Sequence, residues 1–166
     1  MTEMNDEDKQ YEKQRNYLWS YFQLHSSQRL TTVNFFILIS TVIITGYWFG
    51  IDKFPFLGII IGIVLILISF VFWKLDQRNR FIIKNVESAL RYLESKNKLQ
   101  DNSNTPHMLN IFSYEEKLTS ELKSNSVLFW NRHFTYTACF NTIFVIFASL
   151  GLLGVIFSII LIIYVK

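Results

Sequence analysis

Apolar residues are concentrated in three long runs, at residues 31–50, 56–74 and 136–166, and polar residues fill the stretches before and between them. The middle run carries no charged side chain from Phe56 to Trp73. A helix of about 18 residues is about 27 Å long, which nearly matches the ~30 Å hydrocarbon core of a bilayer. The run is apolar on every side, whereas a soluble helix keeps one polar face. The pattern therefore predicts an all-α integral membrane protein with three transmembrane helices.

The first two runs are predicted to form a transmembrane hairpin over residues 31–74, because only residues 51–55 connect them. The second helix is expected to continue past Trp73 to about residue 94, roughly 40 residues in all, since neither proline nor glycine interrupts it. Its continuation should be amphipathic, because apolar residues recur there at the three-, four- and seven-residue spacings of one helix face. These residues are Leu75, Ile82, Val86, Ala89 and Leu93. Such a face must be covered, either within the chain or by a neighbouring copy.

The polar stretches are predicted to be cytoplasmic and largely helical. Residues 1–30 carry aromatic and basic residues that suit a helix at the membrane surface or in a helical bundle. Residues 75–135 are expected to form a helical region interrupted by a loop at 97–110, after which Ser113 is expected to be the N-cap of a helix. Residues 136–166 are expected to make one tilted crossing, because each half is too short to cross by itself.

The positions of lysine and arginine predict the orientation. Of the 16 such residues, 14 lie in residues 1–30 and 74–132, and the other two are Lys53 and Lys166. Cytoplasmic segments hold the excess of positive charge. We therefore expect a multi-pass protein of the inner (plasma) membrane, in contact with membrane lipid, with the N-terminus cytoplasmic and the C-terminus outside.

Composition adds two exclusions. Charged residues make up 17% of the chain, against roughly 25% in an average protein, which agrees with a membrane protein. Cys139 is the only cysteine, so no disulfide can form within the chain. The three histidines are isolated, and no metal-binding, nucleophile or phosphate-loop motif is present. The sequence therefore predicts a protein that is not an enzyme and has no metal or cofactor.

Polar residues inside the predicted spans are the candidates for a pore lining. Asn34, Thr41 and Thr45 fall on one stripe of the first span, and Thr137 and Asn141 fall on one stripe of the third. In lipid such groups turn toward protein or water. Threonine hydroxyls can instead bond to carbonyls of their own helix, and this alternative stays open. No charged residue or histidine lies deep in a span, which argues against a proton-coupled transporter.

Gly58 and Gly62 form a GxxxG pattern in the second span. Two glycines on one helix face let another helix approach closely, so they are predicted to be helix-packing residues. The sequence leaves open whether the partner helix belongs to the same subunit.

Basic residues that follow the second span are candidates for a ligand site. A phosphate-bearing ligand, such as a nucleotide or a short nucleic acid, would use their charge and an aromatic stacking surface. The alternative is attraction to anionic lipid headgroups. Seven acidic residues in the same region dilute the positive charge. The candidate ligand-binding residues are Arg78, Arg80, Lys84, Arg91 and Tyr92.

The exit of the second span reads Phe-Trp-Lys-Leu-Asp-Gln-Arg-Asn-Arg at residues 72–80 and continues as Ile-Ile-Lys-Asn-Val-Glu-Ser-Ala-Leu at residues 82–90. This segment resembles small bacterial anti-phage membrane effectors, namely SLATT-type proteins and the membrane component of the Hailong system, which are encoded beside nucleotidyltransferases. The likeness covers about the first 95 residues, and the third span is an addition to the two-span SLATT plan. The resemblance implies a homo-oligomeric channel, with a tetramer preferred, and an operon-encoded nucleotidyltransferase partner.

The function expected from the sequence is thus a homo-oligomeric inner-membrane channel or pore-forming effector in bacterial anti-phage defence. A nucleotide or nucleic-acid oligomer would gate it through the cytoplasmic helices. The alternative is a non-conducting membrane anchor or scaffold that recruits a partner protein.

Overall fold

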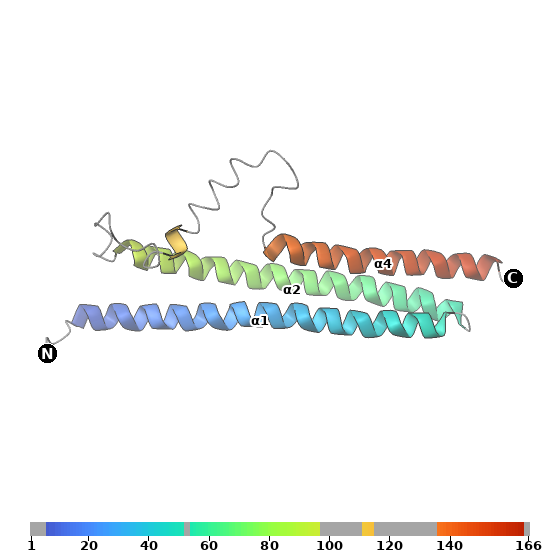
Figure 1. Cartoon of the computed structure of the whole chain (residues 1–166), viewed down its shortest axis with the longest axis horizontal. Helices are drawn as coiled ribbons and strands as arrows, with labels where there is room; N and C mark the ends of the chain where they lie inside the picture. Colours follow the sequence, from blue (N-terminus) through green and yellow to red (C-terminus); the bar gives the residue numbers. More distant parts are fainter. Residues whose placement is uncertain (1–5, 52–53, 97–110, 115–135, 165–166) are drawn as a thin grey trace, which may run out of the picture. The chain divides into compact units, whose positions relative to one another are not determined.

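The computed structural model describes residues 6–51, 54–96, 111–114 and 136–164, and those residues are helical apart from the short connection between the first two helices. Three long helices are present, α1 (Asp6–Gly50), α2 (Pro55–Lys96) and α4 (Tyr136–Tyr164), and residues 111–114 form one further helical turn (Figure 1). Each of the three is long and apolar enough to span a membrane. The predicted all-α fold with three such helices is confirmed.

The connection between α1 and α2 explains where the two helices stop and start. The N–H of Ile51 donates to the carbonyl of Tyr47 at 3.1 Å, and the N–H of Phe54 donates to the carbonyl of Gly50 at 3.0 Å, so the chain leaves α1 in a tight turn. Pro55 is the first residue of α2. Proline suits this position because its fixed φ matches a helix and its missing N–H would have no partner there. The two helices therefore form the predicted hairpin.

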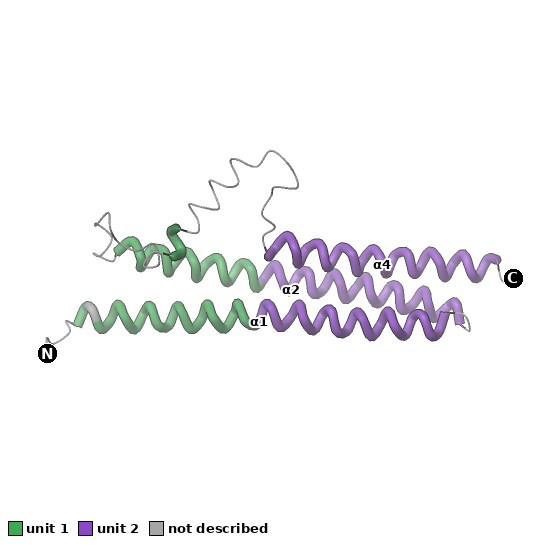
Figure 2. The backbone as a smooth tube through the Cα atoms, in the orientation of Figure 1, with its two compact units in different colours: residues 1–27, 79–133 green, residues 28–78, 134–166 purple. Residues whose placement is uncertain are grey.

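The helices divide between two units, which are coloured separately in Figure 2. Unit 1 consists of residues 1–27 and 79–133, and unit 2 of residues 28–78 and 134–166. Within unit 2, α1 contributes its part from position 28 to 50 and α2 its part from position 55 to 78. At about 1.5 Å per residue each part is about 35 Å long, close to the thickness of a bilayer core. The helices of unit 2 are therefore long enough to cross the hydrocarbon core of a membrane.

The core of unit 2 is aromatic and draws on all three helices. Phe36 of α1 is fully buried, and its ring centroid lies 4.8 Å from that of Phe144 in α4 and 5.4 Å from that of Phe72 in α2. Val33 and Phe140 complete the buried cluster. Because these side chains occupy the space between the helices, the interior of one protomer holds apolar side chains at this level.

The two glycines of the GxxxG pattern lie against α4. A Cβ atom on Gly62 would lie 2.7 Å from Val155 Cγ2 and 2.8 Å from the carbonyl oxygen of Gly151. A Cβ on Gly151 would in turn lie 2.9 Å from the carbonyl oxygen of Gly62. A Cβ on Gly58 would collide with the hydroxyl of Ser158. The backbones of α2 and α4 thus touch inside one protomer, which no larger residue would permit.

Unit 1 is held by a second, smaller set of contacts. α2 buries Ile83, Val86, Leu90 and Leu93 there, and the hydroxyl of Tyr11 in α1 donates to the carbonyl of Leu93 at 3.2 Å. Of the apolar face that the sequence predicts on α2, Val86 and Leu93 are buried, Ile82 and Ala89 are half-buried, and Leu75 is exposed.

The turn at residues 111–114 is held by α2. The carboxylate of Glu94 accepts hydrogen bonds from the backbone N–H of Phe112 and from the N–H and hydroxyl of Ser113. The prediction that Ser113 is an N-cap is wrong, because the chain is already helical at residue 111 and a side chain from another helix supplies the cap. The predicted loop at 97–110 and nearly all of the helix after Ser113 lie outside the described residues.

The predicted boundary at residue 30 is not a break in the backbone, since α1 continues through it. α2 likewise continues from the second span to Lys96 over 42 residues, which confirms the predicted long helix.

The glycine contact makes a stability prediction. Replacing Gly62 by Ala should lower the free energy of unfolding by about 1–3 kcal/mol, because the methyl group meets backbone that cannot move aside cheaply. The measurement is denaturant unfolding in mild detergent. Gly46→Ala is the matched control, since nothing lies within 4 Å of a Cβ at that position. Equal stability of the two variants would contradict the close α2–α4 approach.

Candidate functional site

A buried ion pair joins the three helices of unit 2. Arg29 of α1 donates from Nε to Oδ1 of Asp76 at 2.7 Å and from Nη2 to Oδ2 at 3.0 Å. Nη2 also donates to the hydroxyl of Thr137 in α4 at 3.3 Å, and the guanidinium carbon lies 5.0 Å from the ring centroid of Phe140. The side chains of Arg29 and Asp76 are only 12% and 2% exposed. This bidentate geometry satisfies both charges, which is what a buried pair requires.

Arg29 and Asp76 lie in the stretches that the sequence predicts to be polar, and their pairing was not predicted. The sequence did contain a signal for this pair. The number of residues from Arg29 to Gly50, the end of α1, equals the number from Pro55, the start of α2, to Asp76. In an antiparallel hairpin, residues at equal distances from the turn lie at the same level. Opposite charges at matching levels thus indicated the pair.

A second polar contact ties α1 to α4 further along. The hydroxyl of Tyr47 donates its hydrogen to the carbonyl of Gly154 at 2.8 Å. Because that hydrogen is used, the buried hydroxyl of Ser158 is the donor in its 3.2 Å contact with Tyr47 Oη. Residues 29 and 47 of α1 thus contact residues 137 and 154 of α4, in the same order along both helices. α4 therefore runs parallel to α1, and α2 runs antiparallel to both.

One face of α1 in unit 2 points away from the core and carries polar groups. It is exposed at every third or fourth position from residue 31 to residue 48, whereas Val33, Phe36 and Ser40 on the other side are buried. The exposed positions of α2 between Phe56 and Trp73 carry only hydrocarbon side chains. We call the polar face of α1 the outer stripe, and it consists of Thr31, Asn34, Leu38, Thr41, Thr45 and Trp48.

Three of the predicted pore-lining residues lie on the outer stripe, and two of these are satisfied by their own helix. The hydroxyl of Thr41 donates to the carbonyl of Ile37, and that of Thr45 donates to the carbonyl of Thr41, each at 2.8 Å. The exposed amide of Asn34 has no hydrogen-bond partner among the described residues. Asn34, like Thr31 and Trp48 at the two ends of the stripe, therefore needs a hydrogen-bond partner from beyond the described residues.

The two predicted pore-lining residues of α4 are placed differently. Thr137 is half-buried and accepts the hydrogen bond from Arg29. Asn141, one turn later, is half-buried as well. The structure therefore does not bring Thr137 onto the outer stripe, and its hydroxyl already belongs to the ion-pair contact.

The predicted ligand-binding residues are distributed over several faces of α2. Arg80, Lys84 and Arg91 share one face at spacings of four and seven residues, and Arg91 donates to the hydroxyl of Ser88 at 3.3 Å. Arg78 is exposed, and the exposed ring of Tyr92 lies under the ammonium of Lys96 at 4.8 Å. The cavity of unit 1 lies elsewhere.

That cavity measures about 280 Å³ and has walls of mixed polarity. Arg15, Asn16 and Trp19 contribute from α1, Glu94 from α2, and Phe112 from the helical turn. The ring centroids of Trp19 and Phe112 are 6.3 Å apart in an edge-to-face arrangement. The carboxylate of Glu94, which lines the cavity as well, accepts the three hydrogen bonds of the helical turn described above. A cation, an amide and an aromatic face thus converge on one hollow.

Metal sites need a group of at least three histidine, cysteine, aspartate or glutamate side chains. Among the described residues, no such group is present.

The fold and these contacts define a class, namely a small α-helical membrane protein whose three apolar helices are tied together by glycine contacts and by a buried ion pair. A protein of Escherichia coli named CD-NTase-associated protein 19 is 35% identical to this chain over 157 residues, which are 90% of this chain and 91% of the relative. The chain belongs to the family of CD-NTase-associated protein 19. No protein-family model and no solved structure matches it.

The relative's name agrees with one part of the resemblance seen in the sequence, because it associates that protein with a CD-NTase. The more specific likeness to SLATT-type proteins stays a prediction.

The ion pair makes a prediction in the form of a double-mutant cycle. Arg29→Met or Asp76→Leu alone should lower the free energy of unfolding by about 3–5 kcal/mol, because each leaves one buried charge without its partner. The double variant should be more stable than either single variant. Denaturant unfolding in mild detergent measures all four proteins. Asp6→Ala removes the exposed Asp6–Lys9 pair and should leave stability unchanged. Additive losses in the cycle would show that the two charges do not stabilise each other.

Proposed function

We propose that this chain is the membrane component of an anti-phage defence system and acts together with a CD-NTase. The support is the family, whose E. coli member is named for its association with such an enzyme, and the three helices that suit a membrane protein. The positive charge of residues 1–30 and 74–132 supports an orientation with the N-terminus in the cytoplasm and the C-terminus outside.

We further propose that several copies assemble into a channel lined by the outer stripe. The single observation that carries this proposal is the exposed amide of Asn34 near the start of a polar face of a spanning helix. Hydrocarbon offers a side-chain amide no hydrogen-bond partner, so leaving it in lipid costs free energy. Outer stripes that face one another around a common axis would place Asn34 in water or against the next copy.

Two further observations support the assembly. The exposed residues of the stripe alternate at spacings of three and four, which is the pattern by which helices pack around a shared axis. The inside of a single protomer is occupied by Phe36 and its aromatic neighbours, so an aqueous path must run between protomers.

Gating by a nucleotide is proposed to act through the cavity of unit 1. Trp19 offers a stacking surface for a base, Arg15 a cation for a phosphate, and Asn16 an amide for a base edge. α1 continues from these residues into the outer stripe within one helix. A ligand that shifts α1 in unit 1 therefore acts on the same helix that lines the proposed path.

A second candidate function is a non-conducting anchor that recruits a partner protein. The observation that favours it is the bonding of Thr41 and Thr45 to their own helix, because both side chains then tolerate a dry environment. An anchor of this kind would be a monomer in mild detergent, whereas the channel would be an oligomer.

The channel proposal predicts which positions of α1 meet water. In a Cys139→Ser background, cysteines at positions 34, 41 and 45 should react with a membrane-impermeant thiol reagent at least tenfold faster than a cysteine in place of Ile39, and their modification should lower ion flux from liposomes. Ile39 is the control because it is exposed on the same helix but lies about 120° or more around it from those three positions. Equally slow reaction at all four positions, together with a monomeric mass, would favour the anchor.

The gating proposal predicts the effect of one aromatic side chain. Trp19→Ala should weaken the binding of nucleotides or short oligonucleotides by about tenfold, because stacking on an aromatic side chain contributes ~1–3 kcal/mol per base. Isothermal titration with a panel of such ligands measures this. Lys84→Ala should leave the affinity unchanged, since Lys84 does not line the cavity. The opposite result would move the ligand site to the basic face of α2.

A further inference from the structure

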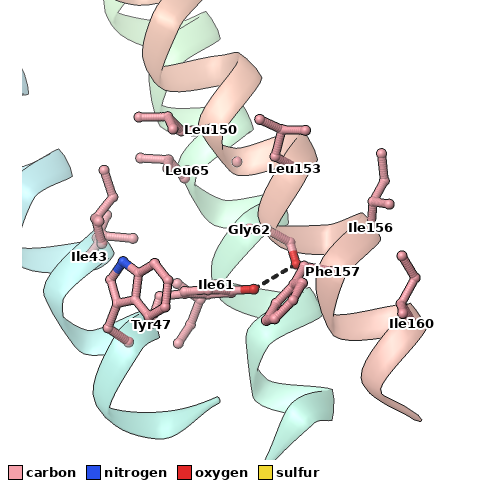
Figure 3. A pocket seen from close by; sticks show the side chains of 14 residues that line it. Ile43, Tyr47, Ile61, Gly62, Leu65, Leu150, Leu153, Ile156, Phe157 and Ile160 are labelled. Atoms are coloured by element: carbon pink, nitrogen blue, oxygen red, sulfur yellow. Dashed lines mark hydrogen bonds between the residues drawn. The ribbon is translucent and has the colours of Figure 1, made fainter. Parts of the chain in front are cut away.

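A cavity of about 420 Å³ lies between α1, α2 and α4 inside unit 2. Figure 3 shows Ile43 and Tyr47 of α1, Ile61 and Leu65 of α2, and residues of α4 around it. Glycines of α2 and α4 form part of its wall. Of the residues of the outer stripe, only Trp48, at its end, also lines this cavity.

The wall of the cavity is hydrocarbon. Apart from Tyr47 and Trp48, every lining side chain belongs to isoleucine, leucine, phenylalanine or glycine. The hydroxyl of Tyr47 is already bonded to the carbonyl of Gly154, as the dashed line in Figure 3 marks. A ligand in this cavity therefore finds no free polar partner except the indole N–H of Trp48, and its buried part must be apolar.

The size of the cavity separates two apolar occupants. A helix with its side chains is about 10 Å wide, so a neighbouring copy would reach the cavity with side chains only. A flexible alkyl chain is much thinner and can enter the cavity lengthwise. The geometry favours an alkyl chain over a second copy of this protein.

The surroundings supply such a chain. The lining helices are the apolar ones that suit a membrane, so the medium around unit 2 is lipid. An apolar hollow left empty loses dispersion contacts along its whole lining. Trp48, near the end of α1, has the amphipathic ring found at the level of lipid headgroups. We propose that the cavity between α1, α2 and α4 holds one acyl chain of a membrane phospholipid.

The test uses the full-length protein and does not depend on conduction. The protein is reconstituted in phosphatidylethanolamine and phosphatidylglycerol vesicles that contain phosphatidylethanolamine with a diazirine in the middle of one acyl chain. It is then extracted into mild detergent, washed free of loosely held lipid and irradiated. Labelled residues are mapped by mass spectrometry. We expect the retained label at Ile61 and Leu65, at least fivefold above that at Ile63 and Leu67, which lie on the same helix outside the cavity.

Two neighbouring leucines of α4 provide a matched pair of variants. Leu153 lines the cavity and is 60% exposed, whereas Leu152 does not line it and is 54% exposed. Leu153→Trp should fill the hollow and lower the retained label at least fivefold, and Leu152→Trp should leave it within twofold of the unchanged protein. Since both positions are on the surface, both variants should keep their unfolding midpoint.

Three results would overturn the proposal, and the unchanged protein alone can give each of them. One is no retained label after the wash. Another is equal labelling of the cavity residues and of Ile63 and Leu67. The third is labelling of the cavity by a free diazirine fatty acid added in the same amount but not by the phospholipid, which would assign the site to a different ligand.

Discussion

A polar group held among apolar helices must find its partner inside the protein, because hydrocarbon offers none. The ion pair of Arg29 and Asp76 follows from this constraint, since each charge is paired twice and the guanidinium also reaches α4. The pair lies at one end of unit 2. Tyr47 and Ser158 meet the same constraint about 27 Å further along α1, at the helical rise per residue.

These two polar contacts and the glycine contact of α2 with α4 serve different purposes. Close backbone approach at Gly62 and Gly151 gains dispersion contacts between α2 and α4. The ion pair and the Tyr47 hydrogen bonds are directional, and they attach α4 to α1 at two separate levels. The packing therefore stabilises the three-helix unit, and the polar contacts fix its register and the parallel direction of α4.

The outer stripe departs from this rule, as does the buried hydroxyl of Ser40, which has no hydrogen-bond partner among the described residues. Thr41 and Thr45 are satisfied locally, whereas Asn34 is not. A family member in E. coli is named for its association with a CD-NTase. In the proposed assembly around the stripe, such an association would act on the membrane through the channel. The cavity between α1, α2 and α4 is lined almost entirely by hydrocarbon and shares Trp48 with the stripe, so the same helix presents a polar face and an apolar face.

The sequence by itself determined the three spanning helices and the hairpin, because uninterrupted hydrophobic length and the short connection ending at Pro55 allow little else. It also named Gly58 and Gly62, since small residues at that spacing act through the backbone. It did not determine their partner, nor the pairing of Arg29 with Asp76 and Thr137. Those contacts depend on how far each helix is rotated and shifted against its neighbours, which residues distant in the chain decide together and no local pattern encodes.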